Sequence, residues 1–209
     1  TNIPFTGDVV VENGIVKAQI DSEGRITRFL LGETDVAGGK GKFTADYYTW
    51  ENNESNYHPI KARSHKILYQ NDSMIDLYYE DNKGALEVEL HYVFMKGLSG
   101  FYSYIVVQGK EKPAIVQEIR SVYRLNPELF DYAYTSDDLQ GRLMPIEDLK
   151  NSTEIMDATF QLENGTVYTK YNWANYIEDD LVHGIVGNGS SSSSDNLANA
   201  KKERIGAWV

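Results

Sequence analysis

The chain has no cysteine among its 209 residues, which excludes disulfide bonds and thiolate chemistry. It has no run of about 18 apolar residues, so no transmembrane helix is predicted. A glycine-rich phosphate loop, an H-E-x-x-H motif and a G-x-S-x-G motif are also missing. Because these signatures of nucleotide, zinc and serine chemistry are absent, we expect neither a cofactor nor a metal.

Positive charge is also scarce. The sequence carries 20 lysines and arginines against 31 aspartates and glutamates, which gives a formal net charge of −11. The estimated pI is about 4.8. A chain with this balance repels nucleic acid and anionic lipid unless it has a local basic patch. We therefore predict no nucleic-acid partner and no membrane partner.

Tyrosine and alternating patterns are abundant instead. The chain has 15 tyrosines, a residue that suits half-buried strands and platforms that stack on sugar rings. In residues 85–95 (ALEVELHYVFM), apolar side chains alternate with Glu87, Glu89 and His91. A period of two residues predicts a half-buried strand with one apolar face.

Further strands are predicted by the same pattern. Segments of this kind, separated by turn-forming residues, recur at 8–12, 15–20, 25–31, 65–70, 73–80, 101–108, 115–125 and 155–162. The one segment with weak helical character is 136–150, and Pro145 interrupts it. Many short strands without convincing helices predict an all-β fold, a sandwich or a barrel.

The polar segment 187–203 (GNGSSSSSDNLANAKKE) predicts a flexible surface loop within a single sandwich domain over residues 1–209. A linker between domains is the alternative, but the chain resumes after it with Arg204–Val209 (RIGAWV), which has the character of a strand. Because this strand would need neighbours, we expect the sequence to be a fragment.

Five asparagines begin N-x-S/T triplets, which are acceptor sites for N-glycosylation in secreted proteins. They are Asn53, Asn71, Asn151, Asn164 and Asn188. The triplets favour an extracellular, glycosylated protein.

Two arginines stand four residues apart in EIRSVYRLN (118–126). In a strand, Arg120 and Arg124 lie on one face, roughly 13 Å apart at about 3.3 Å per residue. Two guanidinium groups on one side of a sheet match repeated carboxylates along a polymer. The alternative is that both arginines pair with acidic neighbours such as Glu118.

Lys170 lies in an aromatic segment, VYTKYNWANY (167–176). Aromatic surroundings desolvate an ammonium group and lower its pKa, which a lysine acting as a base requires. The alternative is a surface lysine that makes cation–π contacts.

Other charged groups are more simply explained as structural features. Glu178, Asp179 and Asp180 favour a solvated acidic turn, and Asp137–Asp138 favours a helix cap over calcium ligands. The basic stretch 58–66 (HPIKARSHK) either lines the path of an anionic substrate or forms a solvated loop and strand edge.

Several motifs together resemble the rhamnogalacturonan lyases of fungi, plants and some bacteria. The similar segments, in order, are VENGIVKAQIDSEGRITRFLLGETDV (11–36), KGLSGFYSYIVV (96–107), EIRSVYRLN (118–126), SDDLQGRLMP (136–145), TKYNW (169–173) and LVHG (181–184). The resemblance implies a large antiparallel β-sandwich of the super-sandwich, galactose-mutarotase-like kind, incomplete at its C-terminal end. It also implies β-elimination in the rhamnogalacturonan I backbone of pectin, next to galacturonic acid.

The same resemblance implies roles for three residues. Arg120 and Arg124 match the substrate-binding arginines, and Lys170 matches the catalytic base. The family's histidine acid follows the strand equivalent to 204–209, so the remaining C-terminal part of the same protein is the expected partner that supplies it. Two other functions stay open: an acidic-glycan-binding module without turnover, and a glycoside hydrolase with a carboxylate pair.

Overall fold

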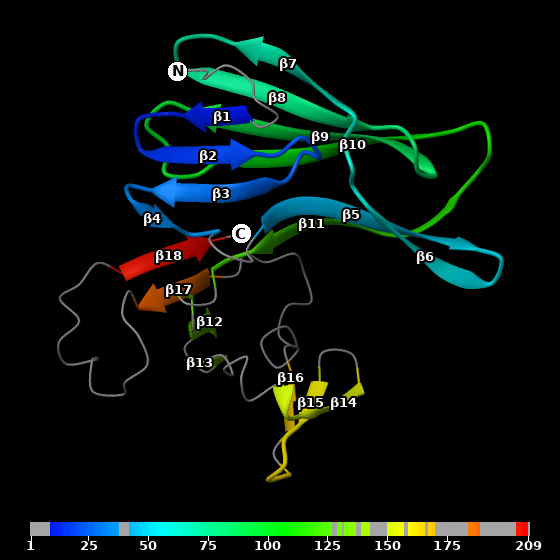
Figure 1. Cartoon of the computed structure of the whole chain (residues 1–209), viewed down its shortest axis with the longest axis vertical. Helices are drawn as coiled ribbons and strands as arrows, with labels where there is room; N and C mark the ends of the chain where they lie inside the picture. The colour runs from blue at the N-terminus through cyan, green and yellow to red at the C-terminus, as the bar shows by residue number, and fades with distance from the viewer. Residues whose placement is uncertain are drawn as a thin grey trace. The chain divides into compact units, whose positions relative to one another are not determined.

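The computed structural model is drawn in Figure 1. It describes residues 9–37, 42–126, 129–130, 132–136, 139–142, 150–156, 159–165, 167–169, 184–188 and 204–208. Every element with described bounds is a β-strand, and the strand pairs are antiparallel. Lys150 is the single helical position in the described ranges. The all-β prediction is therefore confirmed. Within the described ranges, no helix is long and apolar enough to span a membrane.

The chain divides into two compact units, Thr1–Asn126 and Pro127–Val209. Strands β1 to β11 belong to the first unit, and β12 to β18 belong to the second. The single sandwich domain expected over residues 1–209 stays a prediction.

One sheet of the first unit has the order β1-β2-β3-β5-β11, with β4 paired to β3 and β6 paired to β5. Its strands are β1 (Val9–Glu12), β2 (Val16–Ile20), β3 (Ile26–Leu31), β4 (Thr34–Asp35), β5 (Lys42–Glu51), β6 (Glu54–Pro59) and β11 (Ile115–Arg124). Strand β5 therefore lies between β6 and β11, and these three strands carry the surface described in the next section.

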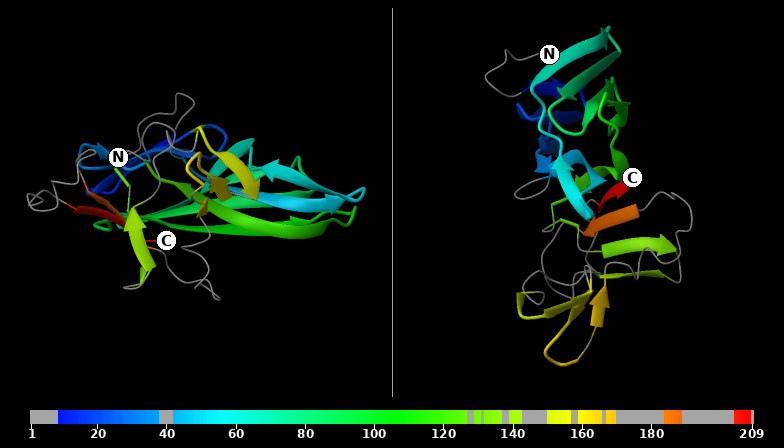
Figure 2. Two further views of the ribbon diagram at one scale, coloured as in Figure 1. Left: turned by 90° about the horizontal axis from the view of Figure 1, so that it is seen from below. Right: turned by 90° about the vertical axis from the view of Figure 1, so that its right-hand side faces the viewer.

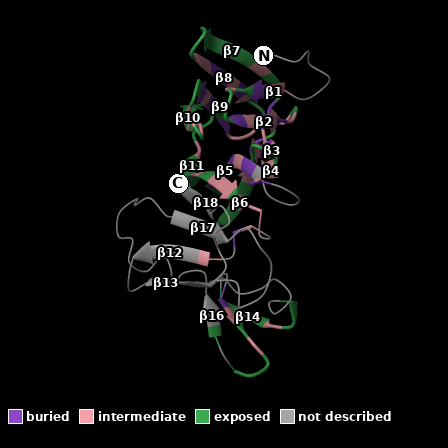
Figure 3. Ribbon diagram, turned by 90° about the vertical axis from the view of Figure 1, so that its left-hand side faces the viewer, coloured by how far each residue is buried: buried purple, intermediate pink, exposed green. Residues whose placement is uncertain are grey.

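A second sheet of this unit has the order β10-β9-β8-β7. Its strands are β7 (Ser64–Gln70), β8 (Met74–Asp81), β9 (Leu86–Met95) and β10 (Tyr102–Gly109). The central strands β8 and β9 hold many buried residues, whereas β7 and β10 are mostly exposed (Figure 3). The sheet therefore gains its stability mainly from its two middle strands.

The alternation predicted for residues 85–95 is confirmed in β9. The apolar face is buried throughout: Leu86, Val88, Leu90, Tyr92 and Phe94. On the opposite face Glu87 is exposed, as expected, but His91 is only 3% exposed. Its imidazole stacks between the rings of Tyr78 and Tyr104, whose centroids lie 4.7 and 4.1 Å away.

The two sheets of the first unit pack face to face through aromatic side chains. Phe101, just before β10, lies 5.4 Å from Phe29 of β3 and 5.8 Å from Phe43 of β5, measured between ring centroids. The buried Tyr47 hydroxyl of β5 accepts a hydrogen bond from the backbone N–H of Leu86. Such contacts between the inner faces of two sheets form the core of a sandwich. Figure 2 shows these strands from two further sides.

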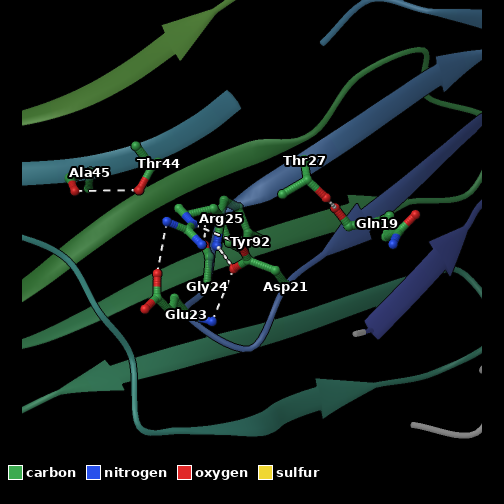
Figure 4. Close-up of polar contacts among 9 residues, drawn as sticks. All are labelled: Gln19, Asp21, Glu23, Gly24, Arg25, Thr27, Thr44, Ala45 and Tyr92. Atoms are coloured by element: carbon green, nitrogen blue, oxygen red, sulfur yellow. Dashed lines mark hydrogen bonds and ion pairs between the residues drawn. The ribbon is translucent and has the colours of Figure 1, made fainter. Parts of the chain in front are cut away.

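The turn between β2 and β3 is held by one carboxylate (Figure 4). Asp21 Oδ1 accepts hydrogen bonds from the backbone N–H groups of Glu23 and Arg25, at 3.0 and 2.9 Å. Asp21 Oδ2 accepts a third from Nε of Arg25 at 2.7 Å. The hydroxyl of Tyr92, in the other sheet, donates to the carbonyl of Gly24 at 2.7 Å. This turn therefore ties the two sheets together at one end.

The second unit contains a sheet of order β13-β12-β17-β18 and a sheet of order β14-β15-β16. The strands are β12 (Tyr132–Ser136), β13 (Leu139–Arg142), β14 (Thr153–Met156), β15 (Thr159–Gln161), β16 (Val167–Thr169), β17 (Gly184–Asn188) and β18 (Arg204–Trp208). The strand character expected after residue 203 is confirmed by β18, which pairs with β17.

Three expectations for the second unit change. The weak helical character of 136–150 is wrong over Leu139–Arg142, which forms β13 and pairs with β12. Gly141 and Pro145 both disfavour a helix there. The single strand predicted at 155–162 is replaced by β14 and β15, which pair antiparallel after the chain reverses. Residues 187–188 belong to β17, and the rest of the predicted loop 187–203 lies outside the described residues.

Strands β5 and β6 were not predicted, because their sequence mixes charged, aromatic and amide residues. A two-residue turn joins them, with Asn52 and Asn53 at φ values of 55° and 64°. Positive φ at both positions suits asparagine and matches the twist of a β-hairpin. The Asn-Asn pair between aromatic segments was therefore the available signal for this hairpin.

Candidate functional site

Strands β11, β5 and β6 present one face that is rich in arginine and tyrosine. Antiparallel pairing places Arg120 opposite Asp46, and Tyr48 opposite both Glu118 and Tyr57. Side chains alternate along each strand, so these residues lie on the face opposite to the buried apolar residues of β5. The local strand period thus separates a polar outer face from an apolar inner one.

A buried aspartate holds Arg120 on this face. The Nε and Nη2 groups of Arg120 donate to Oδ1 and Oδ2 of Asp46 at 2.7 and 2.9 Å. The Asp46 side chain is 2% exposed, and the hydroxyl of Tyr57 also donates to its Oδ2 at 3.2 Å. A forked pair of this kind fixes the plane of the guanidinium group as well as its position.

Aromatic rings surround the same guanidinium group. Its central carbon lies 5.0 Å from the centroid of the Tyr48 ring, in cation–π geometry. The rings of Tyr48 and Tyr57 are themselves 5.0 Å apart and tilted. Hydrogen bonds to Asp46 raise the pKa of Arg120 further, so this arginine keeps its positive charge. Partial burial, and then the Asp46 charge, raise the pKa of Tyr57, which keeps its hydroxyl protonated.

Arg124 differs from Arg120 in its partners. It lies on the same face of β11 and is exposed. Within the part of the chain that the structure describes, no hydrogen bond or ion pair is seen for its side chain. Its positive charge lowers the pKa of Tyr57, which opposes the larger effects that raise it. Among the described residues, no carboxylate holds the Arg124 guanidinium in the way that Asp46 holds Arg120.

The alternative considered from the sequence, that the arginines pair with acidic neighbours, holds in part. Nη1 of Arg120 lies 3.3 Å from a carboxylate oxygen of Glu118. The stronger pair is with Asp46, which is 74 positions away in the sequence. That partner depends on the pairing of β5 with β11, and the sequence motif gave no sign of it.

The model of the rhamnogalacturonate lyase family matches residues 4–162, which include β1 to β15 and both arginines. The chain belongs to the rhamnogalacturonate lyase family. The resemblance inferred from the ordered motifs is therefore confirmed.

Relatives within the rhamnogalacturonate lyase family are distant. A rhamnogalacturonate lyase from Dickeya dadantii is 28% identical over 190 residues, which cover 86% of this chain and 32% of that protein. Rhamnogalacturonate lyase B from Emericella nidulans is 27% identical over 138 residues, which cover 59% of this chain and 20% of that protein. The chain thus spans a minor part of the length of these curated relatives.

The predicted base of this rhamnogalacturonate lyase family member, Lys170, lies outside the described residues. So do the acidic residues Glu178–Asp180 and the pair Asp137–Asp138. The roles of Lys170, Arg120 and Arg124 stay predictions. Among the described residues, no group of three or more histidine, aspartate or glutamate side chains is arranged to hold a metal ion.

The basic stretch 58–66 makes contacts at some positions and is exposed at others. The ring of His58 stacks on Tyr47 at 4.5 Å, and its Nε2 lies 2.7 Å from Oγ1 of Thr49. Lys66 donates to Glu80 at 2.9 Å. Lys61 and Arg63 of the same stretch are exposed. Whether the stretch is a solvated loop and strand edge or the path of an anionic substrate stays a prediction.

Asp46, Tyr48 and Tyr57 are the residues that the sequence reasoning missed. The segment DYYTW (46–50) places Asp46, Tyr48 and Trp50 at alternate positions, which is the pattern of one strand face. That alternation was the signal for a polar and aromatic surface. Which residues stand opposite it on β6 and β11 depends on strand register, which is a property of the fold.

Proposed function

We propose that this chain is part of an enzyme that cleaves the rhamnogalacturonan I backbone of pectin by β-elimination at galacturonic acid. Membership of the rhamnogalacturonate lyase family supports this proposal. The observation that carries it is the shared face of Arg120 and Arg124, next to Tyr48 and Tyr57. Arginines suit the carboxylates of galacturonate, and tyrosine rings suit the apolar faces of sugars.

In the proposed reaction, either Arg124 or the outward edge of Arg120 binds the carboxylate of galacturonate. It neutralises the negative charge that develops when the neighbouring C5 proton is removed. The neutral amine of Lys170 takes this proton. The electron pair of the C5–H bond forms the C4–C5 double bond while the C4–O4 bond breaks, and an acid protonates the departing O4.

The general acid is not assigned to a described histidine. His58 stacks on Tyr47, His65 stacks on Tyr79, and His91 lies between two tyrosine rings. These contacts support structural roles for all three.

The proposal includes two finer points. We place the sandwich in the super-sandwich, galactose-mutarotase-like class, which is supported by the two face-to-face antiparallel sheets of the first unit. We also propose an extracellular location. This is supported by the exposure of four of the sequon asparagines, which lie in turns or loops: Asn53, Asn71, Asn151 and Asn164.

An ultraviolet assay on rhamnogalacturonan I separates the candidate functions. A lyase produces absorbance from the new C4–C5 double bond, whereas a hydrolase releases reducing ends without it and a binding module does neither. We expect the absorbance to rise with the wild-type form of the whole enzyme of which this chain is proposed to be part. Lys170→Ala should reduce that rate by about a hundredfold or more, which is the usual contribution of a general base.

Lys83→Ala is the matched control, because Lys83 is an exposed lysine in the β8–β9 turn. It should keep the wild-type rate. Full activity in Lys170→Ala would remove the base assignment, and reducing ends without absorbance would replace the lyase proposal with hydrolysis.

A further inference from the structure

The guanidinium group of Arg120 has two edges in different environments. Its inner edge, Nε and Nη2, is bound to Asp46, whose side chain is 2% exposed. Its Nη1 group lies 3.3 Å from Glu118, whose side chain is 50% exposed. An arginine has five N–H donors, so the inner pair leaves donors on the outward edge. One arginine therefore has a buried counterion and an exposed one.

These two counterions differ in how readily a ligand can displace them. Releasing Asp46 would leave a buried carboxylate without its charge partner, which is strongly destabilising. The exposed Glu118 can instead turn into water, because an ion pair at a solvent-exposed position contributes little. A ligand carboxylate that approaches Arg120 thus competes with Glu118 and leaves Asp46 in place.

The backbone fixes Glu118 beside this edge. The β11–β5 register shifts between Val116 and Glu118, where one extra residue, Gln117, enters β11. The Oγ of Ser55 donates to Oε1 of Gln117 at 2.6 Å and so ties this bulge to β6. From Glu118 onward the pairing is regular, with Glu118 opposite Tyr48 and two residues before Arg120. Bulges commonly reorient side chains beside functional sites.

We propose that Glu118 is an internal competitor for acidic ligands on this face: its carboxylate occupies the outward edge of Arg120 until a hexuronate carboxylate of the substrate displaces it. This inference rests on the proposed function. A neutral sugar makes no charge-assisted bond to replace the Glu118 contact, so it gains nothing from the exchange. Glu118 therefore weakens the binding of acidic glycans and leaves the binding of neutral glycans unaffected.

Calorimetric titration of the whole chain tests the proposal. The ligands are a rhamnogalacturonan oligosaccharide that contains galacturonate and the same oligosaccharide with its carboxyl groups reduced to alcohols. Glu118→Gln should lower the Kd for the acidic ligand by roughly two- to fivefold, the range expected for removal of one exposed ion pair. Its Kd for the reduced ligand should not change. Glu118→Asp keeps the negative charge, so its Kd for the acidic ligand should be closer to that of the wild type.

Glu87→Gln is the charge-matched control, because it removes one exposed carboxylate from β9 in the other sheet. It should leave both Kd values unchanged. If Glu118→Gln bound the acidic ligand no more tightly than the wild type, the proposal would be overturned. It would also be overturned if Glu87→Gln lowered the Kd for the acidic ligand by the same factor, or if Glu118→Gln lowered the Kd for the reduced ligand by that factor. Failure of the wild type to bind the acidic ligand would instead overturn the proposed function, and with it this role of Glu118.

Discussion

At the scale of single residues, Gly24 in the β2–β3 turn is under two constraints (Figure 4). Its φ is +84°, and a Cβ placed there would lie 2.9 Å from both Cβ and Cγ of Tyr79. The positive φ costs an L-residue about 1 to 2 kcal/mol. The close approach to Tyr79 is overpacking, which costs about 1 to 3 kcal/mol. Gly24→Ala should therefore lower the free energy of unfolding by about 2 to 5 kcal/mol, measured by urea denaturation.

Gly14→Ala isolates the first of these costs. Gly14 has a φ of +92°, and a Cβ there would meet no atom within 4 Å. Gly14→Ala should therefore lower the free energy of unfolding by about 1 to 2 kcal/mol. Equal losses in the two variants would show that Tyr79 moves aside and that packing does not constrain Gly24.

At the scale of elements, the row Tyr78–His91–Tyr104 crosses strands β8, β9 and β10. The Tyr104 hydroxyl donates to Asp76 Oδ2 at 2.8 Å, and desolvation together with this bond raises the Tyr104 pKa from 10.0 to about 12. Because the folded state holds this proton more tightly, its stabilising contribution is complete below pH 10 and is lost as pH rises towards 12. Stability should therefore fall less steeply in Tyr104→Phe over this window.

Urea denaturation at several pH values between 10 and about 12 measures how steeply the free energy of unfolding falls with pH. Tyr102→Phe is the control, because Tyr102 is 59% exposed on the same face of β10 and, in the described residues, its hydroxyl has no hydrogen bond. It should keep the wild-type slope. A wild-type slope in Tyr104→Phe would show that the bond to Asp76 does not resist alkaline titration.

At the scale of the whole molecule, burial is uneven. Strands β8 and β9 pair on both sides and hold fully buried side chains such as Tyr79 and Tyr92. Strand β14 of the second unit has four exposed residues in a row. Amides in well-packed strands exchange only when large parts of the fold open, whereas exposed strands open locally.

Hydrogen exchange followed by mass spectrometry should therefore find the slowest peptides in β8 and β9. Peptides that cover β14 should exchange much earlier. Both come from strands with antiparallel partners, so the comparison tests burial and not the presence of a sheet. Equal protection of the two regions would contradict a fold whose stability is concentrated in the first unit.

Local pattern was enough for most strands of the first unit. The alternation of 85–95 placed the apolar face of β9 correctly, because the two-residue period is a property of the extended backbone itself. It did not predict the burial of His91 on the other face, which depends on Tyr78 and Tyr104 of the neighbouring strands. The hairpin of β5 and β6 was missed because its strands are polar and aromatic, although its Asn52–Asn53 turn and the alternation in residues 46–50 were local signs of it. The reversal between β14 and β15 was missed because short strands give a weak pattern.

The sequence by itself determined the all-β class, the family and the shared face of Arg120 and Arg124, because strand period and motif order are local along the chain. Only the tertiary structure decided that Arg120 is held by Asp46, whereas Arg124 has no such partner among the described residues. The physical reason is register: pairing β5 with β11 brings together residues 74 positions apart, and a shift of one residue would turn Asp46 to the other face.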